Sequence, residues 1–243
     1  MSSQWQNFLC NLGEWHGSFS TLGPDGQPLT STPSILTLEQ GAEERLVHFR
    51  LRRFQDQSRS TEPIHDLRQE YRSLGRQVVF FANGTFCKGS LQVAPGTAFG
   101  AEFGFIDGDR RHRLVLLHEP EGAFEKLVLI REFRAGSDAA ERPPLSPEQL
   151  LGHWHGHEDT IHADWPEPEP RDCSLNLDPE AIAAGRLLPD GGYCLGPAAV
   201  SHRQAFSIEA LWLPAADRMQ RLIRRYDASG AWISASHQVL TRA

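Results

Sequence analysis

Hydrophobic residues recur at two different spacings along this chain. Near the N-terminus, Trp5, Phe8, Leu9 and Leu12 fall on one helical face, which predicts a short helix. Beyond that point the pattern changes to short apolar runs and alternating positions, which is typical of β-strands. A second short helix is predicted from residue 146, where a serine suits the N-cap and a proline the first helical position. Nearly all the chain that follows each helix predicts strand.

Two halves of the sequence repeat each other. Residues 12–17 (LGEWHG) return as residues 151–156 (LGHWHG), and residues 83–89 (NGTFCKG) return as residues 190–196 (DGGYCLG). Further pairs follow in the same order: residues 99–105 with 206–212, 113–117 with 221–225, and 124–133 with 232–240. The Asn-Gly and Asp-Gly pairs are hairpin signals, since a type I′ turn needs positive φ at both central residues. One ancestral unit therefore occurs twice.

This repeat predicts an all-β chain of two tandem units. A meander of short antiparallel strands must hide its edges, and closing into a barrel removes them. We therefore expect one antiparallel barrel at residues 1–134 and another at residues 146–243, each preceded by a short helix. A polar, proline-containing linker is expected at residues 135–145. The second barrel should be smaller, because the stretch after its tryptophan is shorter.

Composition narrows the possible partners. The chain is 40% hydrophobic and 23% charged, which is ordinary for a globular protein, and its net charge of -7 argues against a nucleic-acid partner. No run approaches the roughly 18 apolar residues of a membrane span, and the start lacks a secretory signal, so a cytoplasmic protein is expected. The sequence also lacks a P-loop, a dinucleotide fingerprint and a zinc-protease motif. An enzymatic role is therefore the weaker interpretation.

The Gly-x-Trp segments resemble the signature of the calycin superfamily of lipocalins and fatty-acid-binding proteins. Residues 83–92, 99–106 and 129–132, together with residues 150–165, are similar to a cyanobacterial and plastid family of lipocalin-like proteins of unknown function. S-type phycobilin lyases and nitrobindin-like barrels are more distantly similar. The resemblance implies two tandem lipocalin-like barrels and a role in handling photosynthetic pigment, with bilin or haem as possible cofactors.

The same resemblance implies how each barrel is closed. In lipocalins a late arginine stacks on the early tryptophan and closes the base of the barrel. Arg134 would pair in this way with Trp15, and Arg242 with Trp154, because each arginine follows the last predicted strand of its half. The physical basis is that a planar guanidinium packs flat on indole and still reaches backbone carbonyls.

A ligand cavity would need polar anchors on an apolar wall. Arg113 and Arg221 occupy matching places on apolar strands, so either could clamp a carboxylate inside a barrel, or point outward on an alternating strand. Five aromatic residues recur with period two and are predicted to line the cavity or the core: Phe99, Phe103, Phe105, Phe206 and Trp212.

Other candidate residues have simpler interpretations. His153, His155 and His157 share one face of a strand, as metal ligands can, but lie opposite the inward-pointing Trp154 and are expected to face outward; no metal site is predicted. His237 on the last strand suits a haem ligand or a hydrogen-bonded histidine. The four cysteines match no zinc pattern and are expected to be packing residues.

Three functions remain open from the sequence. The first is non-catalytic binding of an apolar small molecule with an acidic group, such as a tetrapyrrole or a fatty acid. The second is an assembly or scaffold protein with filled barrels that bind a protein partner, such as a phycobiliprotein or a photosynthetic complex. The third is a transferase similar to the bilin lyases. Cavity volume separates the first two, since a ligand site needs about 300 Å³ or more.

Overall fold

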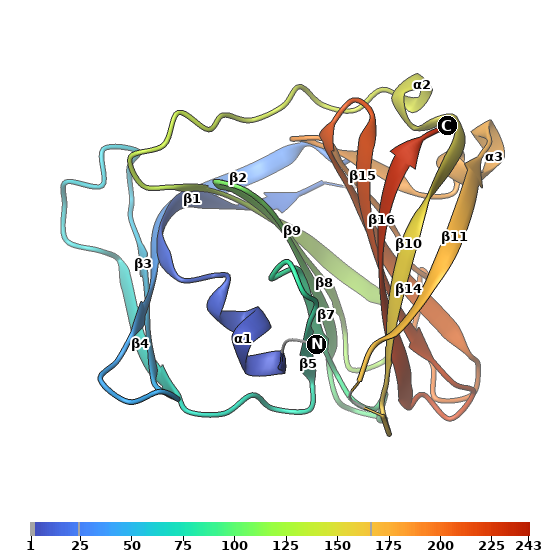
Figure 1. The fold of residues 1–243 in the computed structure, drawn as a ribbon, viewed down its shortest axis with the longest axis horizontal. Coiled ribbons are helices and arrows are strands. Elements are labelled where there is room, and N and C mark those ends of the chain that lie inside the picture. The colour runs from blue at the N-terminus through green and yellow to red at the C-terminus, as the bar shows by residue number, and fades with distance from the viewer. Residues whose placement is uncertain (1–2, 24, 166) are drawn as a thin grey trace.

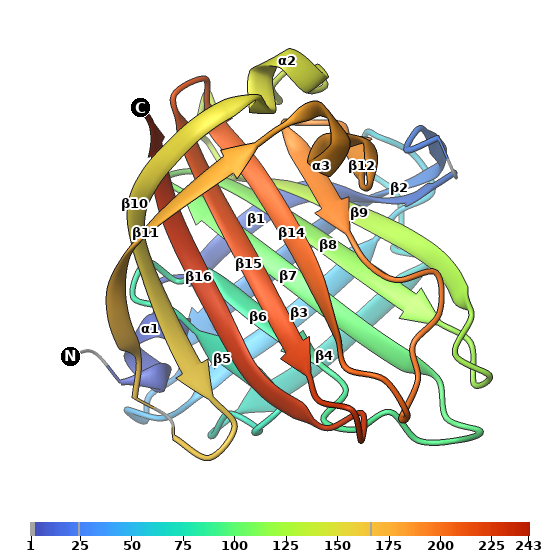
Figure 2. The ribbon, with the colours of Figure 1, turned by 90° about the vertical axis from the view of Figure 1, so that its right-hand side faces the viewer.

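The structure is a computed structural model that describes residues 3–23, 25–165 and 167–243. It contains two separate antiparallel sheets (Figures 1 and 2). The first has the order β4-β3-β2-β1-β9-β8-β7-β6-β5 and comprises β1 (Gly13–Leu22), β2 (Pro28–Gln40), β3 (Val47–Arg53), β4 (His65–Tyr71), β5 (Val78–Phe80), β6 (Phe86–Gly89), β7 (Phe99–Asp107), β8 (Arg110–His118) and β9 (Phe124–Arg134).

The second sheet repeats this arrangement with fewer strands. Its order is β11-β10-β16-β15-β14-β13-β12, and it comprises β10 (Gly152–His162), β11 (Glu169–Leu177), β12 (Arg186–Leu188), β13 (Gly192–Leu195), β14 (Phe206–Ala215), β15 (Arg218–Tyr226) and β16 (Trp232–Arg242). In both sheets the first strand pairs with the last, which is the connectivity of up-and-down barrels. Each barrel is open at one place, between β4 and β5 and between β11 and β12. The prediction of two tandem antiparallel barrels, the second smaller, is confirmed.

Short helices precede both barrels, as the sequence predicts. Helix α1 (Gln4–Leu9) begins at Ser3, whose side chain and backbone exchange hydrogen bonds with Gln6 in a capping box. Helix α2 (Pro147–Leu150) begins at Ser146 with proline at its first position, and a third helix, α3 (Pro179–Ala183), lies beside the opening of the second barrel. Helix α1 lies inside the curve of the first sheet, where it contacts β5 (Figure 1).

The two predicted hairpin turns differ in backbone conformation. In the second barrel both Asp190 and Gly191 have positive φ, at 58° and 74°, as a type I′ turn requires. In the first barrel Gly84 has a φ of 90° but Asn83 does not have positive φ. A side chain on Gly84 would also meet the Cβ atom of Cys10 at 2.6 Å, so glycine permits α1 to approach this turn closely.

The outer faces of the two barrels pack against each other. We call the apolar layer between them the inter-barrel core; its members include Phe81, Phe99, Phe103, Phe105, Leu114, Leu116, Trp212, Leu222, Tyr226 and Trp232. Phe206 packs against this layer. The layer joins β7 and β8 of the first sheet to β14 and β15 of the second (Figure 2). Buried Cys87 and Cys194 also belong to it.

The position of the aromatic residues corrects one expectation. On β7, Gly100, Glu102 and Gly104 have the parity of the barrel interior, and the three phenylalanines between and beside them face the second barrel. The sequence pattern places an apolar stripe on one face of a strand, but it cannot tell a barrel lumen from a face covered by another domain. Phe99, Phe103, Phe105, Phe206 and Trp212 therefore pack between the barrels and do not line the cavity found inside the first barrel.

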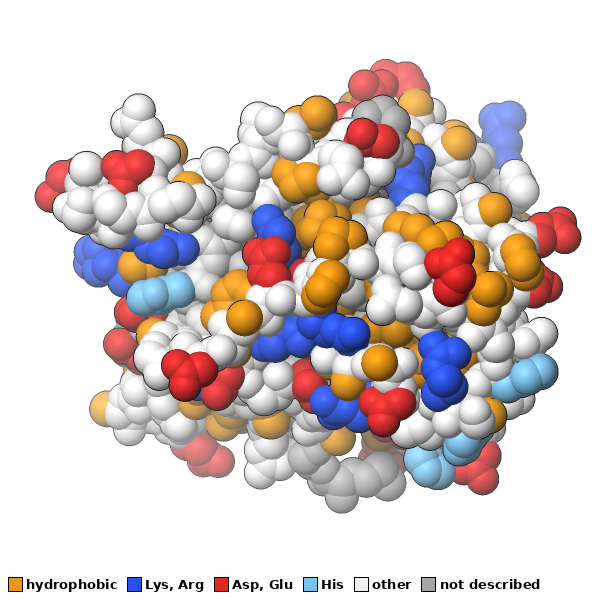
Figure 3. All heavy atoms as spheres, turned by 90° about the horizontal axis from the view of Figure 1, so that it is seen from above, with side chains coloured by type: hydrophobic (Ala, Val, Ile, Leu, Met, Phe, Trp, Pro, Cys, Tyr) orange, Lys and Arg blue, Asp and Glu red, His pale blue; other side chains and the backbone are white. Residues whose placement is uncertain are grey.

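The surface carries both signs of charge. On the face drawn in Figure 3, acidic and basic side chains are interspersed, with hydrophobic side chains between them. His153, His155 and His157 are exposed on the face of β10 opposite buried Trp154. Within the described ranges no three potential metal-ligating side chains come together, and no helix there is long and apolar enough to cross a membrane.

Candidate ligand site in the first barrel

The base of the first barrel is formed by Trp15 on β1 and Arg134 at the end of β9. These residues are register partners on paired strands, and the guanidinium carbon lies 4.3 Å from the centroid of the indole ring. Arg134 Nη1 donates to the carbonyl of Leu12 at 2.9 Å, and Trp15 Nε1 donates to the carbonyl of Asn11 at 3.0 Å. The stack therefore ties the last strand to the segment that follows α1.

The second barrel has the same base. Arg242 lies over Trp154 at 4.3 Å and donates to the carbonyl of Leu151 at 2.7 Å, while Trp154 Nε1 donates to the carbonyl of Leu150 at 2.9 Å. In both halves the early tryptophan and the late arginine are therefore in contact.

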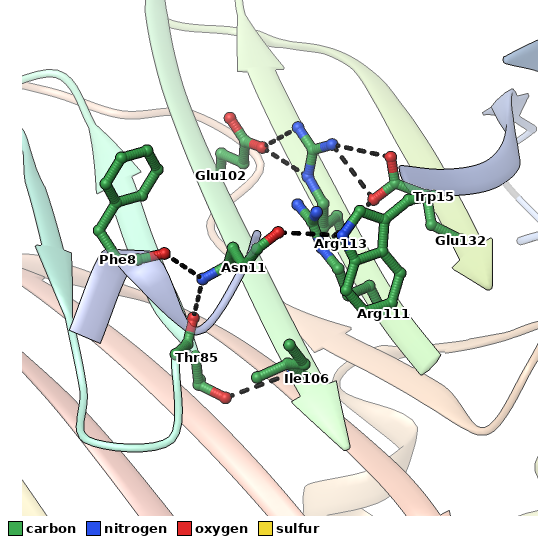
Figure 4. A network of polar contacts seen from close by, with 10 residues as sticks. Phe8, Asn11, Trp15, Thr85, Glu102, Ile106, Arg111, Arg113 and Glu132 are labelled. Atoms are coloured by element: carbon green, nitrogen blue, oxygen red, sulfur yellow. Dashed lines mark hydrogen bonds and ion pairs between the residues drawn. The ribbon is translucent and has the colours of Figure 1, made fainter. Parts of the chain in front are cut away.

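Arg113 points into the first barrel, but it is already engaged. Its Nε and Nη2 atoms donate to Glu102 Oε1 at 3.0 and 2.5 Å, and its Nη1 donates to Glu132 at 3.3 and 3.4 Å (Figure 4). Burial lowers the pKa of Arg113, but the two carboxylates outweigh burial and raise it above its ordinary value. Burial alone would raise the pKa of Glu102, but the charge and hydrogen bonds of Arg113 outweigh burial and lower that pKa overall. Arg113 is thus held in a buried ion-pair network and is not a free clamp.

The second barrel repeats this pair. Arg221 donates to Glu209 Oε2 through Nε at 3.1 Å and also through Nη2, and its Nη1 donates to Gln238 at 3.2 Å. Glu102 and Glu209 occupy matching places in the repeat, on strands β7 and β14. They are the partners that the sequence reasoning missed, although their matched positions beside Arg113 and Arg221 were a usable signal.

Arg111 is a further charged residue at the base of the first barrel. Its side chain is 4% exposed, it lies 4.9 Å from the Trp15 ring centroid, and its Nε is 3.5 Å from Glu132 Oε2. Its Nη1 atom has no hydrogen-bond partner within the described part of the chain. Burial lowers the pKa of Arg111 to about 10, against the opposing attraction of Glu132, so the group stays charged at neutral pH.

A cavity of about 320 Å³ lies above this charged base. One end is lined by Asn11, Lys88, Glu102, Arg111 and Arg113, and the wall is mostly apolar: Phe8, Leu36, Leu38, Phe49, Tyr71, Leu74, Val78, Phe80 and Phe86. The wall includes α1 and residues 73–77 beside the opening between β4 and β5. The cavity therefore has an apolar part and a polar end.

The buried charges at the polar end balance, because Arg111 and Arg113 face Glu102 and Glu132. Exposed Lys88, which also lines the cavity, adds one positive charge. Water is largely excluded around the two arginines, so electrostatic interactions there are stronger than at the surface. The polar end is suited to a negatively charged group.

The interior of the second barrel is filled differently. Met219 and Leu240 occupy the places of Arg111 and Glu132, and both are fully buried in a cluster with Trp154. Further along, Glu158 is 1% exposed and accepts hydrogen bonds from Arg171 at 2.5 Å and from Gln238. Apolar and hydrogen-bonded polar side chains thus occupy the region that corresponds to the polar end of the first cavity.

His237 lies outside both barrel interiors. It is 4% exposed in the layer between the barrels, its ring centroid is 5.2 Å from that of Phe81, and its Nε2 donates to Gln220 Oε1 at 3.1 Å. Its Nε2 nitrogen is therefore engaged within the protein. Burial lowers the pKa of His237 to about 3.

This burial predicts a pH-dependent stability. Because the folded pKa of about 3 lies below the unfolded value of 6.5, the unfolded chain binds more protons between these limits. The stability linked to neutral His237 is complete above about pH 6.5 and is lost as the pH falls toward 3. We expect His237→Leu, the residue found at matching position 129, to reduce the loss of unfolding free energy between pH 7 and pH 5 by about 2 kcal/mol. Urea unfolding at both pH values measures this.

Exposed His153 provides the control for that experiment. Its side chain forms no ion pair among the described residues, so the loss of stability on acidification should be the same in His153→Leu as in the wild type. If His237→Leu and the wild type lose the same stability on acidification, neutral His237 is not the source of the effect.

The fold and site together define a double-barrel β protein with a polar-ended cavity in its first barrel. Residues 1–137 match the family described as "Domain of unknown function (DUF3598), N-terminal", and the chain belongs to the DUF3598 family. The crystal structure of a protein with unknown function from this family, from Nostoc punctiforme PCC 73102, is 35% identical, covers 100% of both chains and has a TM-score of 0.90. This family and fold agree with the resemblance found in the sequence.

Other matches are partial or weak. Residues 141–184 and 181–242 match the C-terminal domain of "Biogenesis factor required for ATP synthase 1". An S-type phycobiliprotein lyase from Guillardia theta matches 100% of this chain and 93% of the lyase at 11% identity, but its TM-score of 0.21 supports no structural argument. The search of curated proteins gave no match.

Proposed function

We propose that the first barrel binds a small apolar molecule that carries an acidic group. Arg111 is the observation on which this proposal rests: a buried guanidinium with one unpaired nitrogen lines the polar end of an otherwise mostly apolar cavity. Leaving a buried donor without an acceptor is costly, and a carboxylate would supply that acceptor and balance the local charge. The apolar part of the ligand would pack against the aromatic and leucine side chains of the wall.

The size of the cavity favours one ligand class over another. About 320 Å³ lies at the lower end of the range of roughly 300 to 1,000 Å³ for small-molecule sites. A single-chain acid suits this volume better than a bulky tetrapyrrole. Arg113, which the sequence suggested as the clamp, is instead paired with Glu102 and Glu132, and Glu132 also contacts Arg111. Fatty-acid-like ligands are therefore the first to test.

Arg111→Met tests this function directly, because methionine stands at the matching position 219 of the second barrel. We expect the variant to bind dodecanoate at least roughly tenfold more weakly than the wild type, since it loses a charge-assisted hydrogen bond. Displacement of a fluorescent fatty acid from the full chain gives both dissociation constants. Lys88→Met, at the same end of the cavity but more exposed, should weaken binding by a smaller factor.

The control for lost charge is Arg45→Met. Arg45 is exposed outside the cavity, so its replacement should leave dodecanoate binding unchanged. The proposal fails if the wild type does not bind dodecanoate, or if Arg111→Met and Lys88→Met both bind it as the wild type does.

A second candidate function is assembly of a protein complex. The match of residues 141–242 to a domain described as part of an ATP synthase biogenesis factor favours this role, and the apolar cluster around Trp154 occupies the region where the first barrel has its polar end. Co-elution of the full chain with purified ATP synthase tests it, with a phycobiliprotein as the comparison partner. Elution of the chain alone in both mixtures would count against assembly with either complex.

A further inference from the structure

Asn11 provides a second unpaired polar atom at the polar end of the cavity. The residue is 2% exposed, and its Nδ2 donates to the carbonyls of Phe8 at 3.3 Å and Gly84 at 2.9 Å. These two acceptors fix the orientation of the amide, because a flipped amide would place its oxygen against two carbonyl oxygens. The side-chain oxygen Oδ1 has no hydrogen-bond partner among the residues that the structure describes.

The residues that carry the unpaired acceptor and the unpaired donor both contact Trp15. The backbone carbonyl of Asn11 accepts from Trp15 Nε1, and the guanidinium of Arg111 lies over the ring of the same tryptophan (Figure 4). Both residues line the cavity. Two buried, unpaired groups therefore belong to residues that contact Trp15. Arg111 Nη1 needs a hydrogen-bond acceptor, and Asn11 Oδ1 needs a donor.

We infer that the natural ligand carries a hydrogen-bond donor close to its acidic group, an inference that rests on the proposed function of the cavity. The acid pairs with Arg111, and an N–H or O–H group donates to Asn11 Oδ1. An N-acyl amino acid or a hydroxy acid has both features, whereas a simple fatty acid leaves Asn11 unpaired. Since an unpaired buried acceptor is costly, a site of this kind discriminates against analogues that lack the donor.

Two ligands that differ in one atom test this inference. N-dodecanoylglycine and dodecanoyloxyacetate have the same chain, the same charge and nearly the same shape, but the first has an amide N–H where the second has an ester oxygen. We expect the full chain to bind the amide roughly tenfold more tightly than the ester, as measured by isothermal titration calorimetry. Equal dissociation constants for the two would overturn the inference.

The outcome separates this inference from the proposed function. If dodecanoate and both conjugates bind with equal affinity and Arg111→Met weakens the binding of all three, the cavity binds acids but does not recognise a hydrogen-bond donor on the ligand. If none of the three binds, the proposed function itself fails. Asn11→Leu, which introduces the residue at matching position 150, should bind amide and ester equally, and this ratio does not depend on how much of the variant is folded.

Discussion

Replacing Trp15 or Trp154 with alanine is expected to lower the free energy of unfolding by about 3–5 kcal/mol, the range for large aromatic side chains removed from a core. Both indoles are fully buried, and each carries an arginine at 4.3 Å and a hydrogen bond to the segment that leads into its barrel. Alanine would leave a void and remove the surface on which the arginine packs. Thermal and urea unfolding of the full chain measure the loss.

Trp165 provides a matched control because it is 55% exposed. Trp165→Ala should change the unfolding free energy by less than about 0.5 kcal/mol, as most exposed substitutions do. If Trp15→Ala or Trp154→Ala unfolds like Trp165→Ala, then the tryptophan–arginine stack is not what holds the base of that barrel together.

The fold was largely predictable because its signals are local and occur twice. The short helices, the alternating strands and the matching Gly-x-Trp segments are each predicted in both halves. The tryptophan–arginine stacks were implied by the resemblance to lipocalins, and the pairing of the first and last strands brings these residues together in each barrel. Each of these sequence patterns is weak alone, but its occurrence in both halves makes the fold prediction more specific.

The same pattern did not predict which face of each middle strand points into the barrel. Period-two alternation on β7 separates two faces, and Phe103 marks one of them as apolar. In an isolated barrel the apolar face would be the interior. Here the second barrel covers the outer face, so Phe103 is fully buried between the barrels while Glu102 and Arg113 occupy the interior. Only knowledge of how the halves pack resolves this choice.

The candidate site also depended on a difference between the repeats. Arg111 has the same parity as Arg113 and aligns with Met219, and Glu132 aligns with Leu240. At these inward-facing positions one half has a charged residue where the other has an apolar one. A comparison of the two halves could have found this signal in the sequence. The unpaired atom of Arg111 depends on three-dimensional packing, and no spacing rule predicts it.

Asp190 connects the two barrels, so its replacement should have an effect comparable to that of the tryptophans. The residue lies in the turn before β13 and is 2% exposed. Its carboxylate accepts hydrogen bonds from Arg110 Nη2 at 2.5 Å and from the backbone N–H of Arg142 at 2.8 Å, and lies 3.2 Å from His112 Nδ1. Burial raises the pKa of Asp190, but His112 and the other partners outweigh it and lower the pKa overall.

Asp190→Ala is expected to lower the unfolding free energy by about 3–5 kcal/mol, because removing one partner leaves the charge of the other buried and unpaired. His112 is 1% exposed and stacked on Trp212, so it cannot turn toward water without disturbing the inter-barrel core. The loss should also uncouple the barrels, and urea unfolding followed by tryptophan fluorescence should change from one transition to two.

Asp190→Asn separates the contribution of the carboxylate charge from that of the hydrogen bonding and backbone conformation of the turn. Asparagine is the residue at matching position 83, and it tolerates the positive φ of 58° found at Asp190. Its amide oxygen can still accept from Arg142, so the variant should lose less stability than Asp190→Ala and keep a single transition. If alanine and asparagine are equally destabilising, the charge on Asp190 and not the hydrogen bonding of the turn accounts for the loss; if Asp190→Ala unfolds at the urea concentration of the wild type, Asp190 does not couple the barrels.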